Sequence, residues 1–155
     1  MENLTKEIIK TLNNLIEVNI DRTKGYETAA KETEDSDLTS LFNKYASQSS
    51  TFRSELEKMV TEKGGEPQKS SSASGTVYRA WMDTKSTLTG NSRKAILSLC
   101  EFGEDAAKKS YKEAKEDSAS YPDTVVSLIS RQYEEILNGH DTVKNLRDSA
   151  VEQHH

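Results

Sequence analysis

The chain has 155 residues, of which 33% are hydrophobic and 30% charged, and a net charge of −5. This balance suits amphipathic helices, which expose most of their circumference to solvent. Lysines and arginines are interleaved with aspartates and glutamates, so the sequence predicts no basic surface for a phosphate backbone. We therefore do not expect nucleic acid to be a partner.

The sequence also argues against membrane insertion and secretion. No stretch approaches the roughly 18 apolar residues of a membrane span, and the first residues lack the basic start and apolar centre of a signal peptide. The single cysteine, Cys100, can form no internal disulfide, which agrees with a reducing compartment. We expect a cytoplasmic protein with no membrane partner. His154 and His155 are set aside, because a terminal histidine pair is also typical of a cloning remnant.

Strong helix breakers divide the chain at residues 64–67, 70–75, 89–91 and 121–123. Between them, apolar residues recur at helical spacing. The pattern predicts one domain over residues 1–155, with long helices over about 5–33, 36–63, 92–117 and 122–152 and a short helix over about 75–88.

The first two predicted helices form a hairpin, because only a few residues separate them. On the first helix, Leu15, Asn19 and Thr23 are expected on the inward face, while Asp21 is expected toward solvent. Asp35 or the next residue is the predicted cap of the second helix.

The later elements have clear start signals. Ser92 is the predicted cap of the helix over residues 92–117, and Pro122 suits the first turn of the last helix. Tyr78 and Trp81 on the short helix are the expected aromatic contact points outside the core, either docking that helix on the bundle or forming a surface for self-association.

Helices of 25–30 residues are roughly 40 Å long, and their apolar faces match only when they pack side by side. The connection between the second and third long helices is long, whereas the other two are short. The predicted fold class is therefore all-α: a ferritin-like four-helix antiparallel bundle with a short crossover helix.

Several segments resemble an uncharacterised bacterial family of ferritin-like four-helix proteins, and together they extend over about residues 5–148. The resemblance implies a ferritin-like fold and no assigned activity. Because the wider superfamily includes di-iron oxidases, rubrerythrins and iron-storage cages, it also raises the question of a metal site. The segments are residues 15–19, 25–30, 79–82, 100–107 and 131–133, followed by His140 and Asp141.

A di-iron site in such a bundle needs an inward Glu from each of two helices and a Glu-x-x-His from each of the other two. Glu104, Gln132, Glu135 and His140 are the candidates on or near inward faces. Glu135 and His140 are five residues apart and diverge by roughly 140° around the helix, so they cannot act as a Glu-x-x-His pair. No cofactor is therefore expected, and iron held by these four residues is the alternative.

A buried polar layer that fixes helix register is the favoured interpretation of the inward polar residues. Gly103 and Gly139 lie inside predicted helices, where each costs roughly 1 kcal/mol relative to Ala. Close helix approach is the expected reason, and a small ligand pocket is the alternative. The expected layer consists of Asn19, Tyr26, Tyr45, Ser49, Glu104 and Gln132, with His140 at its border.

Three functions follow from these patterns. The favoured one is a non-catalytic bundle that acts through association with a protein, either another protein or a second copy of itself in a homodimer, in a stress or maintenance role. The second is iron-dependent redox chemistry at a degenerate site of the ferritin or rubrerythrin type. The third is small-molecule binding in the core near Gly103 and Gly139. No phosphate loop or nucleophile elbow is present in the sequence, which favours a protein that is not an enzyme.

Overall fold

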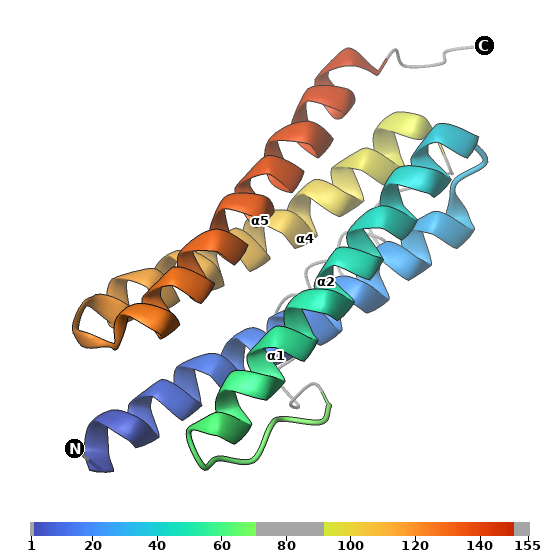
Figure 1. The fold of residues 1–155 in the computed structure, drawn as a ribbon. Helices are drawn as coiled ribbons and strands as arrows, with labels where there is room; N and C mark the ends of the chain where they lie inside the picture. The colour runs from blue at the N-terminus through green and yellow to red at the C-terminus, as the bar shows by residue number, and fades with distance from the viewer. Residues whose placement is uncertain (1, 71–91, 151–155) are drawn as a thin grey trace.

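A computed structural model describes residues 2–70 and 92–150 of the chain, and four long helices account for most of them (Figure 1). They are α1 (Glu2–Glu32), α2 (Ser36–Glu62), α4 (Arg93–Asp117) and α5 (Asp123–Ser149), and one 3-10 turn, Ser118–Ser120, joins α4 to α5. The described ranges contain no strand. The short helix predicted over residues 75–88, with Tyr78 and Trp81, lies outside the described residues, as does the predicted end of the last helix beyond residue 150.

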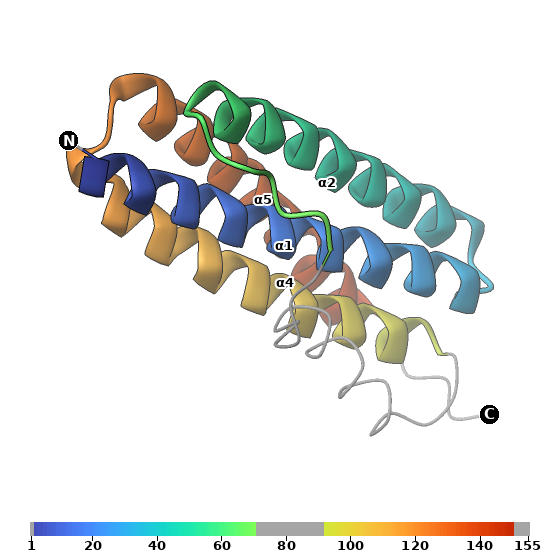
Figure 2. The same cartoon turned by 90° about the horizontal axis from the view of Figure 1, so that it is seen from below.

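The helices pack side by side, and each runs antiparallel to both of its neighbours (Figures 1 and 2). α1 contacts α2 and α4, while α5 contacts α4 and α2. Because α2 and α4 consequently run in the same direction, the chain between them has to return along the bundle. The predicted antiparallel four-helix bundle with one long connection is confirmed.

The first part of that connection, residues 63–70, lies along α1 (Figure 2). Gly64 ends α2 with a φ of +85°, a left-handed conformation that is open to glycine because it has no Cβ. The Asn13 side chain then holds the returning chain. Its Nδ2 donates to the Glu66 carbonyl over 3.1 Å, and its Oδ1 accepts from the Gln68 amide over 2.8 Å.

The other helix ends follow from local chemistry. The Ser92 hydroxyl accepts a hydrogen bond from the Ala95 amide over 3.1 Å, which caps α4. Asp35 is the residue before α2, although its side chain makes no capping hydrogen bond. Pro122 is the residue before α5, whereas the sequence predicted it within the first turn of that helix. Its fixed φ and missing N–H suit a helix start.

None of the helices in the described ranges is long and apolar enough to cross a membrane.

The core is built from apolar residues of all four helices. Toward the middle of the bundle, polar side chains from the same helices replace the apolar ones. Fully buried core residues include Leu12, Phe42, Leu56, Leu97, Ile129 and Ile136.

Candidate functional site

An ion pair lies at the centre of the bundle, fully removed from solvent. Arg22 of α1 and Glu104 of α4 are both 0% exposed. Arg22 Nε donates to Glu104 Oε1 over 2.7 Å, and Nη2 donates to Oε2 over 2.9 Å. Two parallel hydrogen bonds of this kind are the strongest geometry for a guanidinium and a carboxylate. The pair therefore links α1 to α4 at mid-bundle.

Helix α2 binds the remaining side of the same guanidinium. Arg22 Nη1 donates to Gln48 Oε1 over 2.9 Å and to Ser49 Oγ over 2.8 Å. Four of the five guanidinium N–H groups thus have oxygen acceptors. A buried charge is tolerated only when it is paired and hydrogen-bonded in this way.

Two tyrosines complete the surroundings of the ion pair. The Tyr26 hydroxyl donates to Glu104 Oε2 over 2.7 Å. The rings of Tyr26 and Tyr45 lie 5.2 and 5.4 Å from Arg22 Cζ, within the range of cation–π attraction. We call Arg22, Tyr26, Tyr45, Gln48, Ser49 and Glu104 the charged layer.

The electrostatics of the charged layer fix the protonation states of Arg22 and Tyr26. Burial lowers the pKa of the Arg22 guanidinium, but the charge and hydrogen bonds of Glu104 outweigh it and the net pKa is raised. Burial, followed by the charge of Glu104, raises the pKa of Tyr26 well above its ordinary value. Arg22 therefore stays charged and Tyr26 stays neutral at physiological pH.

Helix α5 contributes space to the charged layer. A Cβ placed on Gly139 would lie 2.7 Å from Glu104 Oε2 and 3.0 Å from Arg22 Nη2. Real Cβ atoms do not approach a neighbour at 2.7 Å, so the ion pair occupies the volume that a side chain would need. Close approach thus accounts for Gly139, although two side chains, and not a second helix backbone, make that approach. The same side chains occupy the space that the alternative, a small ligand pocket, would need at this glycine.

A second polar chain crosses the bundle nearby. Asn19 Nδ2 donates to the Tyr111 hydroxyl over 2.7 Å, and that hydroxyl donates to Gln132 Oε1 over 2.7 Å. Gln132 Nε2 in turn donates to Glu55 Oε1 over 3.0 Å and to the Phe52 carbonyl over 3.3 Å. We call Asn19, Glu55, Tyr111 and Gln132 the amide layer. The amide layer joins α1, α2, α4 and α5.

The six side chains expected in one polar layer are all buried, and the structure divides them between these two layers. Tyr26, Tyr45, Ser49 and Glu104 belong to the charged layer. The other two, Asn19 and Gln132, belong to the amide layer.

The four candidate metal ligands do not converge. Glu104 is bound by Arg22, and Gln132 belongs to the amide layer. Glu135 is exposed and accepts from Gln48 Nε2 over 3.3 Å. His140 faces Asp105 Oδ1 at 2.6 Å through Nε2 and Asp141 Oδ1 at 3.2 Å through Nδ1. In the described part of the chain, no three His, Cys, Asp or Glu side chains are grouped to hold a metal ion.

The centre of the bundle does not fit a di-iron group. Such a group needs several anionic oxygens and two histidines, but the charged layer offers one carboxylate with both oxygens bound to a cation. The other acceptors there, Gln48 and Ser49, are neutral and also bind Arg22. A metal ion would have to lie beside a buried guanidinium of the same sign of charge.

The burial of Arg22 was not predicted from the sequence, because charged residues are usually assigned to the exposed face of a helix. Its spacing does carry the signal, since Leu15, Asn19, Arg22 and Tyr26 follow at helical intervals of four, three and four residues. Thr23, expected inward, is only partly buried, and the prediction that Asp21 faces solvent was wrong because it is 2% exposed.

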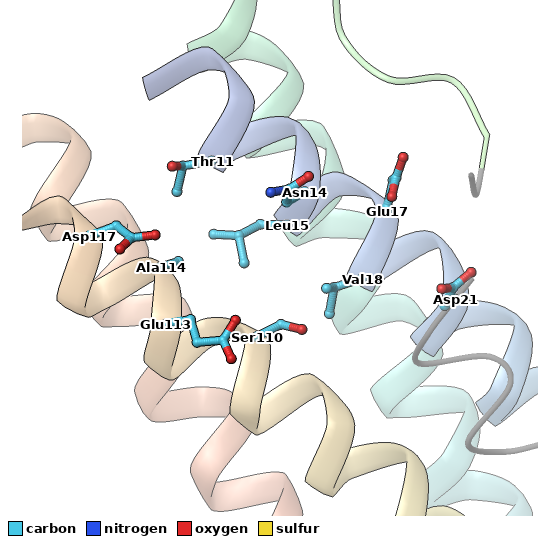
Figure 3. Close-up of a pocket in the computed structure, with 10 residues that line it drawn as sticks. All are labelled: Thr11, Asn14, Leu15, Glu17, Val18, Asp21, Ser110, Glu113, Ala114 and Asp117. Carbon is cyan, nitrogen blue, oxygen red and sulfur yellow. The ribbon is translucent and has the colours of Figure 1, made fainter. Parts of the chain in front are cut away.

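The outer surface offers a groove of about 220 Å³ between α1 and α4 (Figure 3). Leu15 points between the two helices, and the carboxylates of Glu113 and Asp117 lie on the α4 side. Glu17 and Asp21 line the α1 side. The groove therefore presents acidic walls over an apolar floor.

Phe102 on α4 is the exposed large hydrophobic side chain of the described residues, at 54%. Ala95, Ser98 and Ala106, which are partly buried, lie at helical spacing around it. Together the four residues make a weakly polar strip, here called the Phe102 strip, on a surface that is otherwise rich in charge.

Comparisons with known proteins place the chain in a family. The family model described as "Domain of unknown function (DUF2383)" matches residues 7–117. No relative among the curated proteins matches the sequence. The resemblance to a family without an assigned function is thereby confirmed at the level of the sequence.

Solved structures show the same fold. A Dps1 mutant of Mycobacterium smegmatis has a TM-score of 0.80 at 9% identity, covering 95% of this chain and 99% of that one. A dodecameric thioferritin of Bacteroides fragilis, a bacterioferritin-related protein, has 0.74 at 15%, covering 92% and 84%. The bacterioferritin of Desulfovibrio desulfuricans, described with a di-iron site, has 0.77 at 16%, covering 95% and 81%. The bundle is therefore ferritin-like.

Proposed function

The chain belongs to the family described as a domain of unknown function, DUF2383, and we propose that it is a non-catalytic ferritin-like bundle that acts by associating with further copies of itself. The observation that carries the proposal is the exposure of Phe102 within the Phe102 strip. Aromatic side chains are enriched at the centres of protein interfaces, and Phe102 is exposed among small, weakly polar residues that would allow a partner to pack closely.

The charged layer supports the non-catalytic part of the proposal. Its cation and its carboxylate bind each other, and the neighbouring hydroxyl and amide oxygens bind them as well. A general acid, a general base or a nucleophile needs a group that is free to exchange protons with a substrate. In the charged layer, these contacts use both Glu104 oxygens and four of the five Arg22 N–H groups.

The ferritin-like relatives support self-association as the mode of action. The Bacteroides fragilis protein is described as dodecameric, and it shares this fold over most of both chains. A single aromatic residue cannot supply a stable interface, which buries roughly 1,200–2,000 Å² in total. Phe102 is therefore proposed as the centre of a larger contact along α4.

Light scattering coupled to size-exclusion chromatography tests this function across a wide range of protein concentrations. We expect a dimer or larger assembly for the natural chain, and a shift to monomer in Phe102→Asp, because the introduced charge would be desolvated in the contact. Circular dichroism has to show that the helix content of the variant is unchanged.

Ser47→Asp is the matched control, because it adds the same charge at an exposed helical position of α2. Its assembly state is expected to equal that of the natural chain. A natural chain that is monomeric at every concentration would overturn the proposal. If Phe102→Asp leaves the assembly intact, the Phe102 strip is not the surface through which the copies associate.

A further inference from the structure

The charged layer is the point at which all four helices contribute to one small volume. Arg22 comes from α1, Gln48 and Ser49 come from α2, and Glu104 comes from α4. Gly139 of α5 leaves the space that the ion pair fills. A four-helix bundle that holds a metal ion needs inward-facing ligands from facing helices at such a point.

We propose that the Arg22 guanidinium takes the place of a metal ion at the centre of this bundle. The other residues of the charged layer form a binding site for a planar guanidinium and do not take a metal ion. The site recognises the guanidinium group by its charge, its flat shape and its fork of N–H donors. This inference concerns the interior of the bundle and is independent of the proposed self-association.

The charge balance of the layer favours a single monovalent cation. Glu104 supplies one negative charge, and Arg22 supplies one positive charge at hydrogen-bond distance. A divalent ion would leave an excess of positive charge in a volume shielded from water, where charges interact more strongly than in solvent. Displacing the Arg22 guanidinium to admit that ion would leave a buried charge without its partner.

The directions of the contacts also match a guanidinium better than a spherical ion. Two N–H groups meet the two oxygens of Glu104, while Nη1 reaches two acceptors on α2. The rings of Tyr26 and Tyr45 attract the delocalised cation from positions 5.2 and 5.4 Å away. Hard metal ions instead require several carboxylate or water oxygens around one point.

Chemical rescue of Arg22→Ala in the full chain tests the assignment. Removing the side chain leaves Glu104 buried without its partner, and we expect the midpoint of thermal unfolding to fall by about 10 °C. Guanidinium chloride at a low, non-denaturing concentration should recover a substantial part of this loss. Sodium chloride at equal ionic strength, and Mn(II) or Fe(II) under anaerobic conditions, should not.

Arg53→Ala is the matched control. Arg53 pairs with Glu57 on the same helix, with both side chains about one-third exposed, so its removal leaves no fully buried charge. Guanidinium should shift the midpoint of this variant by no more than that of the natural chain. Equal shifts in Arg22→Ala and Arg53→Ala, or a larger gain from Mn(II) or Fe(II) in Arg22→Ala, would overturn the assignment.

Two measurements on the natural sequence keep the assignment falsifiable if Arg22→Ala does not fold. In nuclear magnetic resonance spectra, the Nε proton of Arg22 should exchange with water far more slowly than that of Arg53; equal rates would contradict the closed site. Anaerobic Fe(II) titration of a chain without His154 and His155 should show no stoichiometric binding. Stoichiometric iron that Glu104→Gln abolishes would overturn the proposal, and the oligomeric state of the same samples tests self-association separately.

Discussion

The charged layer links α1, α2 and α4 beside Gly139 of α5, and the amide layer joins all four helices. The two layers differ in whether all their buried polar atoms have partners. In the charged layer, Arg22 and Glu104 are fully buried and densely hydrogen-bonded. The amide layer ends at Glu55, whose side chain is 33% exposed and also binds Arg131. It also leaves Asn19 Oδ1 without a hydrogen-bond partner among the described residues.

The difference follows from the cost of desolvation. An unpaired neutral acceptor costs about 1–3 kcal/mol, which a domain of this size can absorb. A buried charge without a partner costs more, because its whole hydration is lost. The bundle therefore encloses the layer whose charges are fully buried, whereas the amide layer reaches the surface, where its charged member, Glu55, is partly exposed. Four predictions test this comparison.

The largest effect is expected from breaking the ion pair on the carboxylate side. Glu104→Leu leaves the Arg22 guanidinium buried without its counter-charge, and we expect a loss of about 3–5 kcal/mol in the free energy of unfolding. Urea unfolding followed by circular dichroism measures it. Adding Arg22→Met to the same chain should recover part of the loss, since no unpaired charge then remains. A double variant less stable than Glu104→Leu would contradict the electrostatic explanation.

The second prediction concerns the space that α5 leaves for the ion pair. Ala is a better helix former than Gly by about 1 kcal/mol, so Gly139→Ala in an open helix would stabilise the protein. Here the added methyl group would contact Glu104 and Arg22, and we expect a net loss of about 1–3 kcal/mol in urea unfolding. A gain in the free energy of unfolding of Gly139→Ala would contradict this explanation. Ser127→Ala, at an exposed position of the same helix, should change stability by less than about 0.5 kcal/mol.

Alkaline pH should weaken both layers through their tyrosines. Burial is the largest cause that raises the pKa of Tyr26 and of Tyr111 above the ordinary value of 10.0. In the unfolded chain these groups ionise from about pH 10, whereas in the folded chain they stay neutral. The stability they contribute is therefore fully present below pH 10 and is lost as the pH rises above it. We expect a loss of about 2 kcal/mol from the two together between pH 10 and 11, measured by urea unfolding.

The smallest effect is expected in the amide layer. Tyr111→Phe removes the hydroxyl that joins Asn19 to Gln132, and we expect a loss of about 1–2 kcal/mol below pH 10. It should also reduce the alkaline loss by about half, which separates the ionisation of Tyr111 from other high-pH effects. Tyr133→Phe, at a partly buried position, is the control for removal of a hydroxyl. A loss in Tyr111→Phe as large as that in Glu104→Leu would contradict the distinction between the two layers.

The fold could be predicted because its signals are local. Apolar spacing, the breakers at residues 64–67 and 121–123, and the capping Ser92 are each readable within a few residues. The burial of Asn19, Ser49 and Gln132 followed from the same helical periodicity. The pairing within the two layers did not follow, since Arg22 and Glu104 are 82 residues apart and meet only through the helix register.

The sequence by itself determined the four long helices, most of their inward faces and the chain path, because a helix period and a connection length depend on neighbouring residues alone. Only the tertiary structure decided which polar residues are partners. Arg22 lies on the inward face by its spacing, but a buried arginine is stable only when a carboxylate, acceptors from α2 and a glycine on α5 reach it together. That condition depends on how four helices pack.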